Sequence, residues 1–178
     1  WNRYTKGSPT KEFDAIQFVS YCDIEPNDTI IEIGMGGGQT CVLIADRTNH
    51  CIFMDFNWNA VITQKEKNRN LKIVNGDGIK TPFRSRSFSK ILVRNVIHNF
   101  PGNVFRTQFY EESSRIIKNN GELIFGLIPN QIGTYFELEN YINPKWWHRL
   151  RRKHGTWWPI SIREMKKELC GLGFEFVH

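Results

Sequence analysis

Short apolar runs alternate with stretches of helical periodicity along the chain. The runs are rich in β-branched residues and predict buried strands, at 29–33, 51–54, 71–74, 91–96, 122–127 and 174–177. Apolar positions spaced three or four apart predict helices, one beginning at Ser8-Pro9 and others at 40–47, 58–68, 104–118 and 162–172. Strands that alternate with helices indicate an α/β fold, with a doubly wound, mostly parallel sheet and helices on both faces.

Capping residues mark the ends of two of these helices. Ser8 precedes Pro9 in the order expected for an N-cap and a first helical residue. Asn103 is expected to cap the helix at 104–118, which the turn-forming triplet Asn119-Asn120-Gly121 should end.

The length and composition predict one domain, spanning 1–178. The chain has 178 residues, of which 40% are apolar, enough for one core of ordinary size. No apolar run reaches the roughly 18 to 20 residues of a membrane-spanning helix. We therefore expect a soluble domain. The four cysteines show no paired spacing, so we also expect a cytoplasmic setting and no metal site. Because the sequence begins at Trp1 without a visible signal segment, we expect a fragment truncated at both ends.

Most of the net charge of +6 comes from one segment, 145–153. It holds five cations interleaved with Trp146 and Trp147. Such a segment could bind nucleic acid through phosphates and stacked bases, rest on an anionic membrane surface, or form a solvated face.

A glycine-rich turn follows the first predicted strand. Gly34, Gly36 and Gly38 read G-x-G-x-G, whereas a dinucleotide fingerprint would place its third glycine at Gln39. Glycines let the backbone turn sharply and approach a ligand closely. Asp55 ends the second strand, where a carboxylate can accept both ribose hydroxyls, and Asp77 follows the third strand, where it could accept a hydrogen from an adenine amino group. These three strand ends predict a nucleoside site.

Several motifs resemble those of class I S-adenosylmethionine-dependent methyltransferases. The segment 32–38 resembles their first motif, and Asp55 stands where their ribose-binding acid stands. The segments 75–78, 81–83 and 87–88 are similar to their third motif. The resemblance covers almost the whole chain and is nearest to the small-molecule and quinone-type branch, the methyltransferase type 11-like proteins, with Arg94-Asn95-Val96 similar to ubiquinone and menaquinone methyltransferases.

The resemblance implies a Rossmann-like fold that binds S-adenosylmethionine and releases S-adenosylhomocysteine, with no metal. The implied cofactor-binding residues are Glu32, Gly34, Gly36, Gly38, Asp55, Phe56, Asp77, Gly78 and Asn95.

His98 follows the fourth strand and is the candidate general base if the acceptor is a hydroxyl or phenol. The insertion at 129–159, between the fifth strand and the last helix, is rich in aromatic residues and predicts a lid over the acceptor, with Tyr135, Trp146 and Trp147 as candidate contacts. We expect a small-molecule or lipid-like acceptor. The alternatives are a nucleic-acid methyltransferase that uses 145–158, a non-catalytic module, and an NAD-binding module; the sequence does not predict the oligomeric state.

Overall fold

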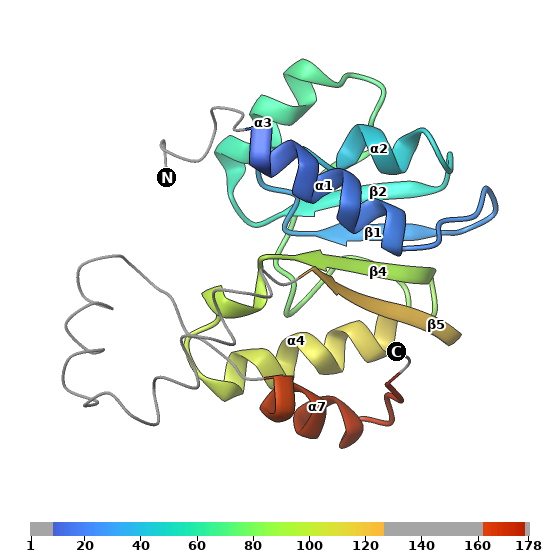
Figure 1. Ribbon diagram of the computed structural model, residues 1–178. Helices are drawn as coiled ribbons and strands as arrows, with labels where there is room; N and C mark the ends of the chain where they lie inside the picture. Colours follow the sequence, from blue (N-terminus) through green and yellow to red (C-terminus); the bar gives the residue numbers. More distant parts are fainter. Residues whose placement is uncertain (1–8, 127–161, 177–178) are drawn as a thin grey trace.

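The chain forms a parallel β-sheet between two layers of helices (Figure 1). The computed structural model describes residues 9–126 and 162–176. The strands are β1 (Ile30–Ile33), β2 (Cys51–Asp55), β3 (Ile73–Asn75), β4 (Phe88–Arg94) and β5 (Ile117–Gly126). The helices are α1 (Pro9–Tyr21), α2 (Cys41–Ala45), α3 (Trp58–Lys67), the 3₁₀ helix η1 (Ile97–Asn99), α4 (Asn103–Ile116) and α7 (Ile162–Cys170).

The five strands run in the order β3-β2-β1-β4-β5, and every neighbouring pair is parallel. The expected doubly wound sheet is therefore confirmed, and the sheet is entirely parallel. The strand order reverses between β1 and β4, where the connections leave toward opposite sides. Ile33 pairs with Met54 on one side and with Val93 on the other, so β1, β2 and β4 end together at one edge. Such a reversal point is where ligands bind in open α/β sheets.

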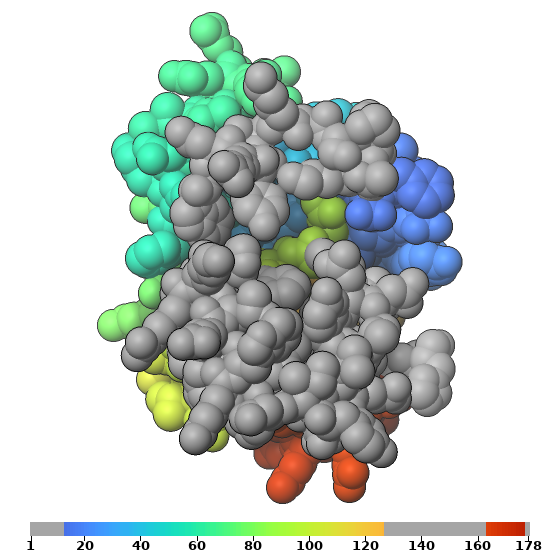
Figure 2. All heavy atoms as spheres, turned by 60° about the vertical axis from the view of Figure 1, so that its left-hand side comes forward, coloured from blue at the N-terminus to red at the C-terminus, as the bar shows by residue number. Residues whose placement is uncertain are grey.

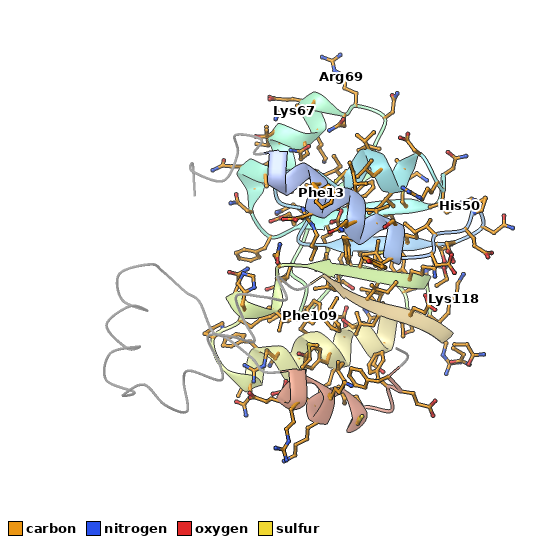
Figure 3. All side chains as sticks on the ribbon, in the orientation of Figure 1. Phe13, His50, Lys67, Arg69, Phe109 and Lys118 are labelled. Atoms are coloured by element: carbon orange, nitrogen blue, oxygen red, sulfur yellow. The ribbon has the colours of Figure 1, made fainter. Side chains whose placement is uncertain are left out.

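Each central strand is buried on both faces. Ile31 and Ile33 of β1 belong to the apolar cluster formed with α4 and α7, whereas Ile30 belongs to the cluster formed with α1, α2 and α3. Phe109 on α4 lies in the first of these layers, on the other side of the sheet from α1, which carries Phe13 (Figure 3). This double burial is why the strands read as continuous apolar runs rather than alternating ones.

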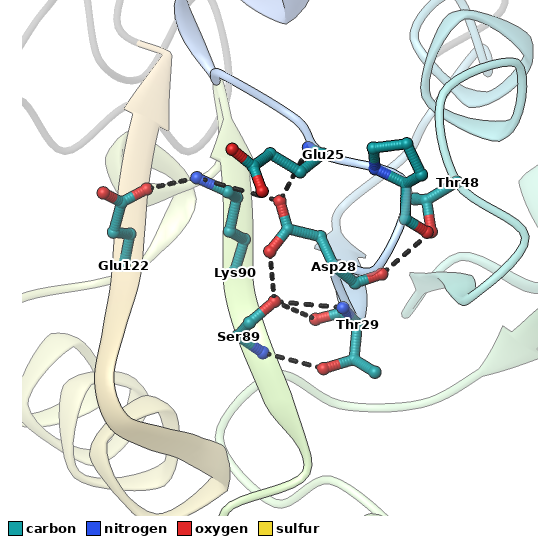
Figure 4. A network of polar contacts seen from close by, with 8 residues as sticks. Glu25, Asp28, Thr29, Thr48, Ser89, Lys90 and Glu122 are labelled. Carbon is teal, nitrogen blue, oxygen red and sulfur yellow. Dashed lines mark hydrogen bonds and ion pairs between the residues drawn. The ribbon is translucent and has the colours of Figure 1, made fainter.

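Polar side chains at the amino ends of β1 and β4 form a closed network (Figure 4). Thr29 and Ser89 exchange two hydrogen bonds, each backbone N–H donating to the other's hydroxyl oxygen at 3.0 Å. The Ser89 hydroxyl donates to Asp28 Oδ1 at 2.7 Å. Lys90 forms an ion pair with Glu122 of β5 and lies 3.9 Å from Asp28. The network joins β1, β4 and β5 at this edge.

The predicted boundary between α4 and β5 is wrong. The helix ends at Ile116 and the strand begins at Ile117, so the triplet 119–121 lies within β5 and does not end the helix. The register jumps here: Phe88 pairs with Ile117, but Lys90 pairs with Glu122. Turn-forming residues, with Asn120 at φ +61°, bulge out of the ladder and let the strand resume.

Other boundaries also differ from the prediction. Asn103 is the first residue of α4, and the N-cap is Gly102, at φ +83° and without a side-chain hydrogen bond. The fourth strand begins earlier than predicted, at Phe88, and ends at Arg94. Residues 174–176 form no strand, so the sixth predicted strand is absent from the described part of the chain. No described helix is both long and apolar enough to cross a membrane.

Candidate functional site

The carboxyl ends of β1, β2 and β4 bring the predicted site residues to one edge of the sheet (Figure 1). Figure 2 turns the left-hand side of Figure 1, where these strand ends lie, toward the viewer. The alternation of side chains along a strand determines the face of the sheet to which Glu32, Asp55 and Arg94 belong. Ile30, Phe53 and Leu92, two positions earlier on the same strands, pack with α1, α2 and α3, so these three polar residues belong to that face of the sheet.

The glycine loop, residues 34–38, turns through three residues with positive φ: Gly34 at +82°, Gly36 at +51° and Gly38 at +70°. Two of them are required by close neighbours inside the protein. A Cβ on Gly34 would lie 2.2 Å from Val96 Cγ2, and a Cβ on Gly38 would lie 2.3 Å from Gln64 Oε1. Gly36 differs, because no atom of the described residues lies within 4 Å of the corresponding position. The middle glycine therefore borders open space, which a ligand could occupy.

Asp55 holds the glycine loop from the end of β2. One carboxylate oxygen accepts a hydrogen bond from the Gly36 N–H at 2.7 Å, and the other accepts one from the Asn57 N–H at 2.8 Å. The side chain is half-buried, and each carboxylate oxygen can accept more than one hydrogen bond. The same carboxylate can thus fix the loop and still accept hydroxyl groups of a ribose.

The part of the candidate site predicted to hold adenine, around Asp77 and Phe56, is less buried than the part around Asp55 and Glu32. Asp77 is half-buried, and its Oδ1 accepts the Ile79 N–H at 3.1 Å, which caps the turn after β3. Phe56 follows Asp55 and is 76% exposed. Gly78 is buried, and a Cβ there would lie 3.1 Å from both Ile33 and Phe109. Gly78 therefore serves packing, and Asp77 and Phe56 remain available to a ligand.

Glu32 is buried beneath the loop, at 1% exposure. Its two carboxylate oxygens accept hydrogen bonds from the Thr40 hydroxyl and, over 3.8 Å, from the Cys41 thiol. Burial raises the pKa of Glu32, and the Thr40 hydrogen bond opposes that rise. In this geometry Glu32 ties β1 to the start of α2 and so supports the loop from below.

Asn95 and His98 follow β4. Asn95 has φ +56°, and its N–H donates to the Gly126 carbonyl at 2.9 Å, which holds the strained residue between β4 and β5. His98 lies on η1 and is 9% exposed. Burial lowers the pKa of His98 to about 4, so the imidazole is neutral near pH 7 and is a weaker base than a free imidazole.

Sequence reasoning missed a buried side chain that shapes the loop. Gln64 on α3 is 3% exposed, and its amide donates to the Gly37 carbonyl at 2.9 Å. A signal existed, because Gln64 falls three positions after the buried Val61 on the same helix face. Thr40, bonded to Glu32, had no comparable signal.

The predicted lid 129–159, its aromatic residues Tyr135, Trp146 and Trp147, and the basic segment 145–153 lie outside the described residues. So does Ser8, the predicted N-cap of α1. These remain predictions from the sequence.

The described residues form a doubly wound domain with a glycine loop at the switch point of its sheet. A family model described as "Methyltransferase domain" matches residues 31–125, more than half of the chain, so the chain belongs to this methyltransferase family. The resemblance to class I S-adenosylmethionine-dependent methyltransferases is thereby confirmed.

Individual relatives differ in what their names say they methylate. The chain is 25% identical over 142 residues to "Probable tRNA methyltransferase 9B" of Mus musculus, covering 76% of this chain and 30% of that protein. It is 28% identical over 105 residues to a demethylmenaquinone methyltransferase of Corynebacterium efficiens, covering 57% of this chain and 42% of that one. The chain thus spans under half the length of either relative.

A solved structure shares the fold. Geranyl diphosphate C-methyltransferase from Streptomyces coelicolor, in complex with Mg²⁺, geranyl-S-thiolodiphosphate and S-adenosyl-L-homocysteine, superposes with a TM-score of 0.67 at 13% identity, covering 91% of this chain and 56% of that one.

Proposed function

We propose that this domain binds S-adenosylmethionine at the carboxyl edge and transfers its methyl group to an acceptor. The observation that best supports this is the open space beside Gly36, next to the half-buried carboxylate of Asp55. Gly34 and Gly38 are explained by contacts within the protein, but the positive φ and empty surroundings of Gly36 are not. A ligand that lies along the loop accounts for them.

Each wall of the site has a proposed role. Asp55 accepts the ribose hydroxyls, while Phe56 covers and Asp77 hydrogen-bonds the adenine. The loop 34–38 lies along S-adenosylmethionine, from its ribose toward its methionine end, which lies near Asn95. Glu32 supports the loop from its buried position.

The chemistry needs little from the protein beyond placement. A sulfonium is already a good methyl donor, so holding the nucleophile in line with the methyl group supplies most of the catalysis, up to roughly 7 to 11 kcal/mol in favourable cases. The methyl bond to sulfur breaks as the bond to the acceptor forms, and a hydroxyl acceptor then loses a proton. His98, held neutral by its burial, is the proposed recipient of that proton.

For the acceptor we propose a small or lipid-like molecule, supported by the quinone-type motif at 94–96 and by the demethylmenaquinone methyltransferase relative. A second candidate is tRNA, favoured by the relatives named "Probable tRNA methyltransferase 9B", which match up to 76% of the chain. The two candidates predict different salt responses, because phosphate-driven binding weakens steeply as salt rises.

Calorimetry with S-adenosylmethionine, S-adenosylhomocysteine and NAD tests the cofactor. We expect binding of the first two, and a loss of about 10- to 100-fold in Asp55→Asn, because a carboxylate that bonds a ligand hydroxyl is worth about 1.5 to 3 kcal/mol. Asp46→Asn removes an exposed carboxylate directly after α2 and is the matched control. Binding of NAD in place of both adenosyl ligands would contradict the proposal.

Transfer from S-adenosylmethionine with a labelled methyl group tests the acceptor. Label should enter a solvent-extractable fraction of cell extract and survive ribonuclease treatment. Label that enters tRNA, and is released by ribonuclease, would replace the first candidate with the second. His98→Ala should lower turnover without changing cofactor affinity, and unchanged turnover would remove His98 from the mechanism.

A further inference from the structure

Arg94 is a cation at the carboxyl edge that no assigned role explains. It is the last residue of β4, half-buried, and it belongs to the same face of the sheet as Glu32 and Asp55. Its partner in β5 is Gly126, where a Cβ would lie 2.7 Å from Phe18 Cδ2 on α1 and 2.8 Å from Arg94 Cγ. Glycine at 126 thus leaves room for both the Phe18 ring and the stem of Arg94.

The guanidinium has most of its hydrogen-bonding capacity in reserve. Its one hydrogen bond among the described residues runs from Nη2 to Gln39 Oε1, just after the glycine loop, and is 3.4 Å long. No described carboxylate lies within ion-pair distance of Arg94. A guanidinium offers five N–H groups in a planar fork that matches a carboxylate. At half-burial, this capacity fits an anionic group brought by a ligand.

Glu32 uses the charge of Arg94 but not its hydrogen bonds: burial raises the pKa of Glu32, and the nearby positive charge of Arg94 opposes that rise. Its oxygens already accept hydrogen bonds from Thr40 and Cys41, and its carboxylate forms no ion pair with Arg94. Arg94 therefore lies between a buried acid that is bonded elsewhere and the loop along which the ligand is proposed to extend. The positive charge offsets the repulsion that Glu32 would exert on an incoming carboxylate.

We propose that Arg94 binds the α-carboxylate at the methionine end of S-adenosylmethionine. This inference rests on the proposed function and names the residue that anchors the cofactor end opposite to Asp55. The contact with Gln39 supports the cofactor over an acid on the acceptor, because Gln39 directly follows the glycine loop. Arg94 and Asp55 then fix the two ends of the donor, and the sulfonium between them is held in place for in-line attack.

The test compares two ligands that differ in the amino-acid end, which carries the α-carboxylate and the α-amino group. S-adenosylhomocysteine carries the amino-acid end, whereas 5′-methylthioadenosine retains the adenosine and the thioether without it. In Arg94→Gln, the Kd of S-adenosylhomocysteine should rise about 10- to 100-fold, the loss typical of a charge-assisted hydrogen-bonded pair. The Kd of 5′-methylthioadenosine should stay within about twofold of its wild-type value. In Arg94→Lys, the Kd of S-adenosylhomocysteine should lie between those of the wild type and Arg94→Gln, because the ammonium group keeps the charge but loses the planar fork of N–H groups.

Controls separate this inference from the proposed function. Arg84→Gln removes an exposed cation on the turn before β4 and should change neither Kd. If the wild type binds neither ligand, the proposed function itself has failed. If it binds both and Arg94→Gln weakens both equally, or neither, Arg94 does not bind the carboxylate. An unchanged Kd for S-adenosylhomocysteine with a raised acceptor KM would instead assign Arg94 to the acceptor and overturn the inference.

Discussion

The polar groups at the two edges of the sheet differ in how fully they are hydrogen-bonded within the protein. At the amino edge, Asp28, Ser89 and Lys90 bond to one another and to neighbouring strands, and Figure 4 shows a closed set of contacts. At the carboxyl edge, Asp55 bonds to the glycine loop and Arg94 bonds to Gln39 just after it, but both keep capacity for further partners. A polar group whose bonds close within the protein contributes to folding, whereas one with spare capacity at a switch point is available to a ligand.

The same division runs through the glycine loop itself. Gly34 and Gly38 are glycines because Val96 and Gln64 leave no room for a side chain. Gly36 is open on that side. Substitutions at the two edges and along the loop should therefore separate effects on stability from effects on binding.

The largest expected effect is that of Gly34→Ala. Its Cβ would lie 2.2 Å from Val96 Cγ2, at φ +82°, so overpacking and backbone strain add to about 4 kcal/mol of lost unfolding free energy. Urea unfolding measures this loss. In Gly34→Ala with Val96→Ala, the second change should cost less than Val96→Ala does alone, because the clash is relieved. Fully additive costs in the double variant would contradict the assigned contact.

The next effect comes from His98 and depends on pH. Its pKa is about 4 in the folded protein and about 6.5 when unfolded, so the unfolded chain binds the proton first as pH falls. The unfolding free energy carries no penalty from His98 above pH about 6.5, and it falls by about 3 kcal/mol between pH about 6.5 and 4 as the unfolded chain gains the proton. His98→Gln should remove this part of the pH dependence. The measurement is the difference in unfolding free energy between wild type and variant across that range, and a difference independent of pH would contradict it.

At the amino edge, Lys90→Met should cost about 2 kcal/mol in stability. It leaves Asp28, whose side chain is 14% exposed, without its nearby cation, while the apolar stem is replaced by one of similar length. Affinity for S-adenosylhomocysteine should not change, because this network lies at the opposite edge from the loop. A loss of affinity at constant stability would end the distinction between the two edges.

The fold was largely predictable because two-sided burial leaves a strong signal. The strands at 29–33 and 51–54 and the loop between them follow from β-branched runs and glycine spacing. The α4–β5 boundary was wrong because Asn119-Asn120-Gly121 carries the same local turn preference whether it ends a helix or bulges from a strand. Only the pairing of Lys90 with Glu122 distinguishes the two.

For the site, the sequence predicted the residues at strand ends, but it did not predict which of them support the glycine loop and which are available to a ligand. Strand order brings Asp55 beside Gly36, so this pairing was implicit in the topology. The burial of Glu32 and the roles of Gln64 and Arg94 depend on side chains from separate elements. Those contacts are tertiary, and no local pattern contains them.

The smallest stability effect, and the sharpest test of the comparison, is Gly36→Ala. At φ +51°, with no atom of the described part of the chain within 4 Å of the new Cβ, the cost is that of the left-handed backbone, about 1 kcal/mol. Gly173→Ala is the matched control, because Gly173 has φ +83° and is equally open but lies after α7. Both variants should unfold at similar urea concentrations. Only Gly36→Ala should lose affinity for S-adenosylhomocysteine, by about 10-fold or more, since its methyl group enters the space assigned to the ligand. Equal affinities in the two variants would mean that the open side of Gly36 faces solvent rather than the cofactor.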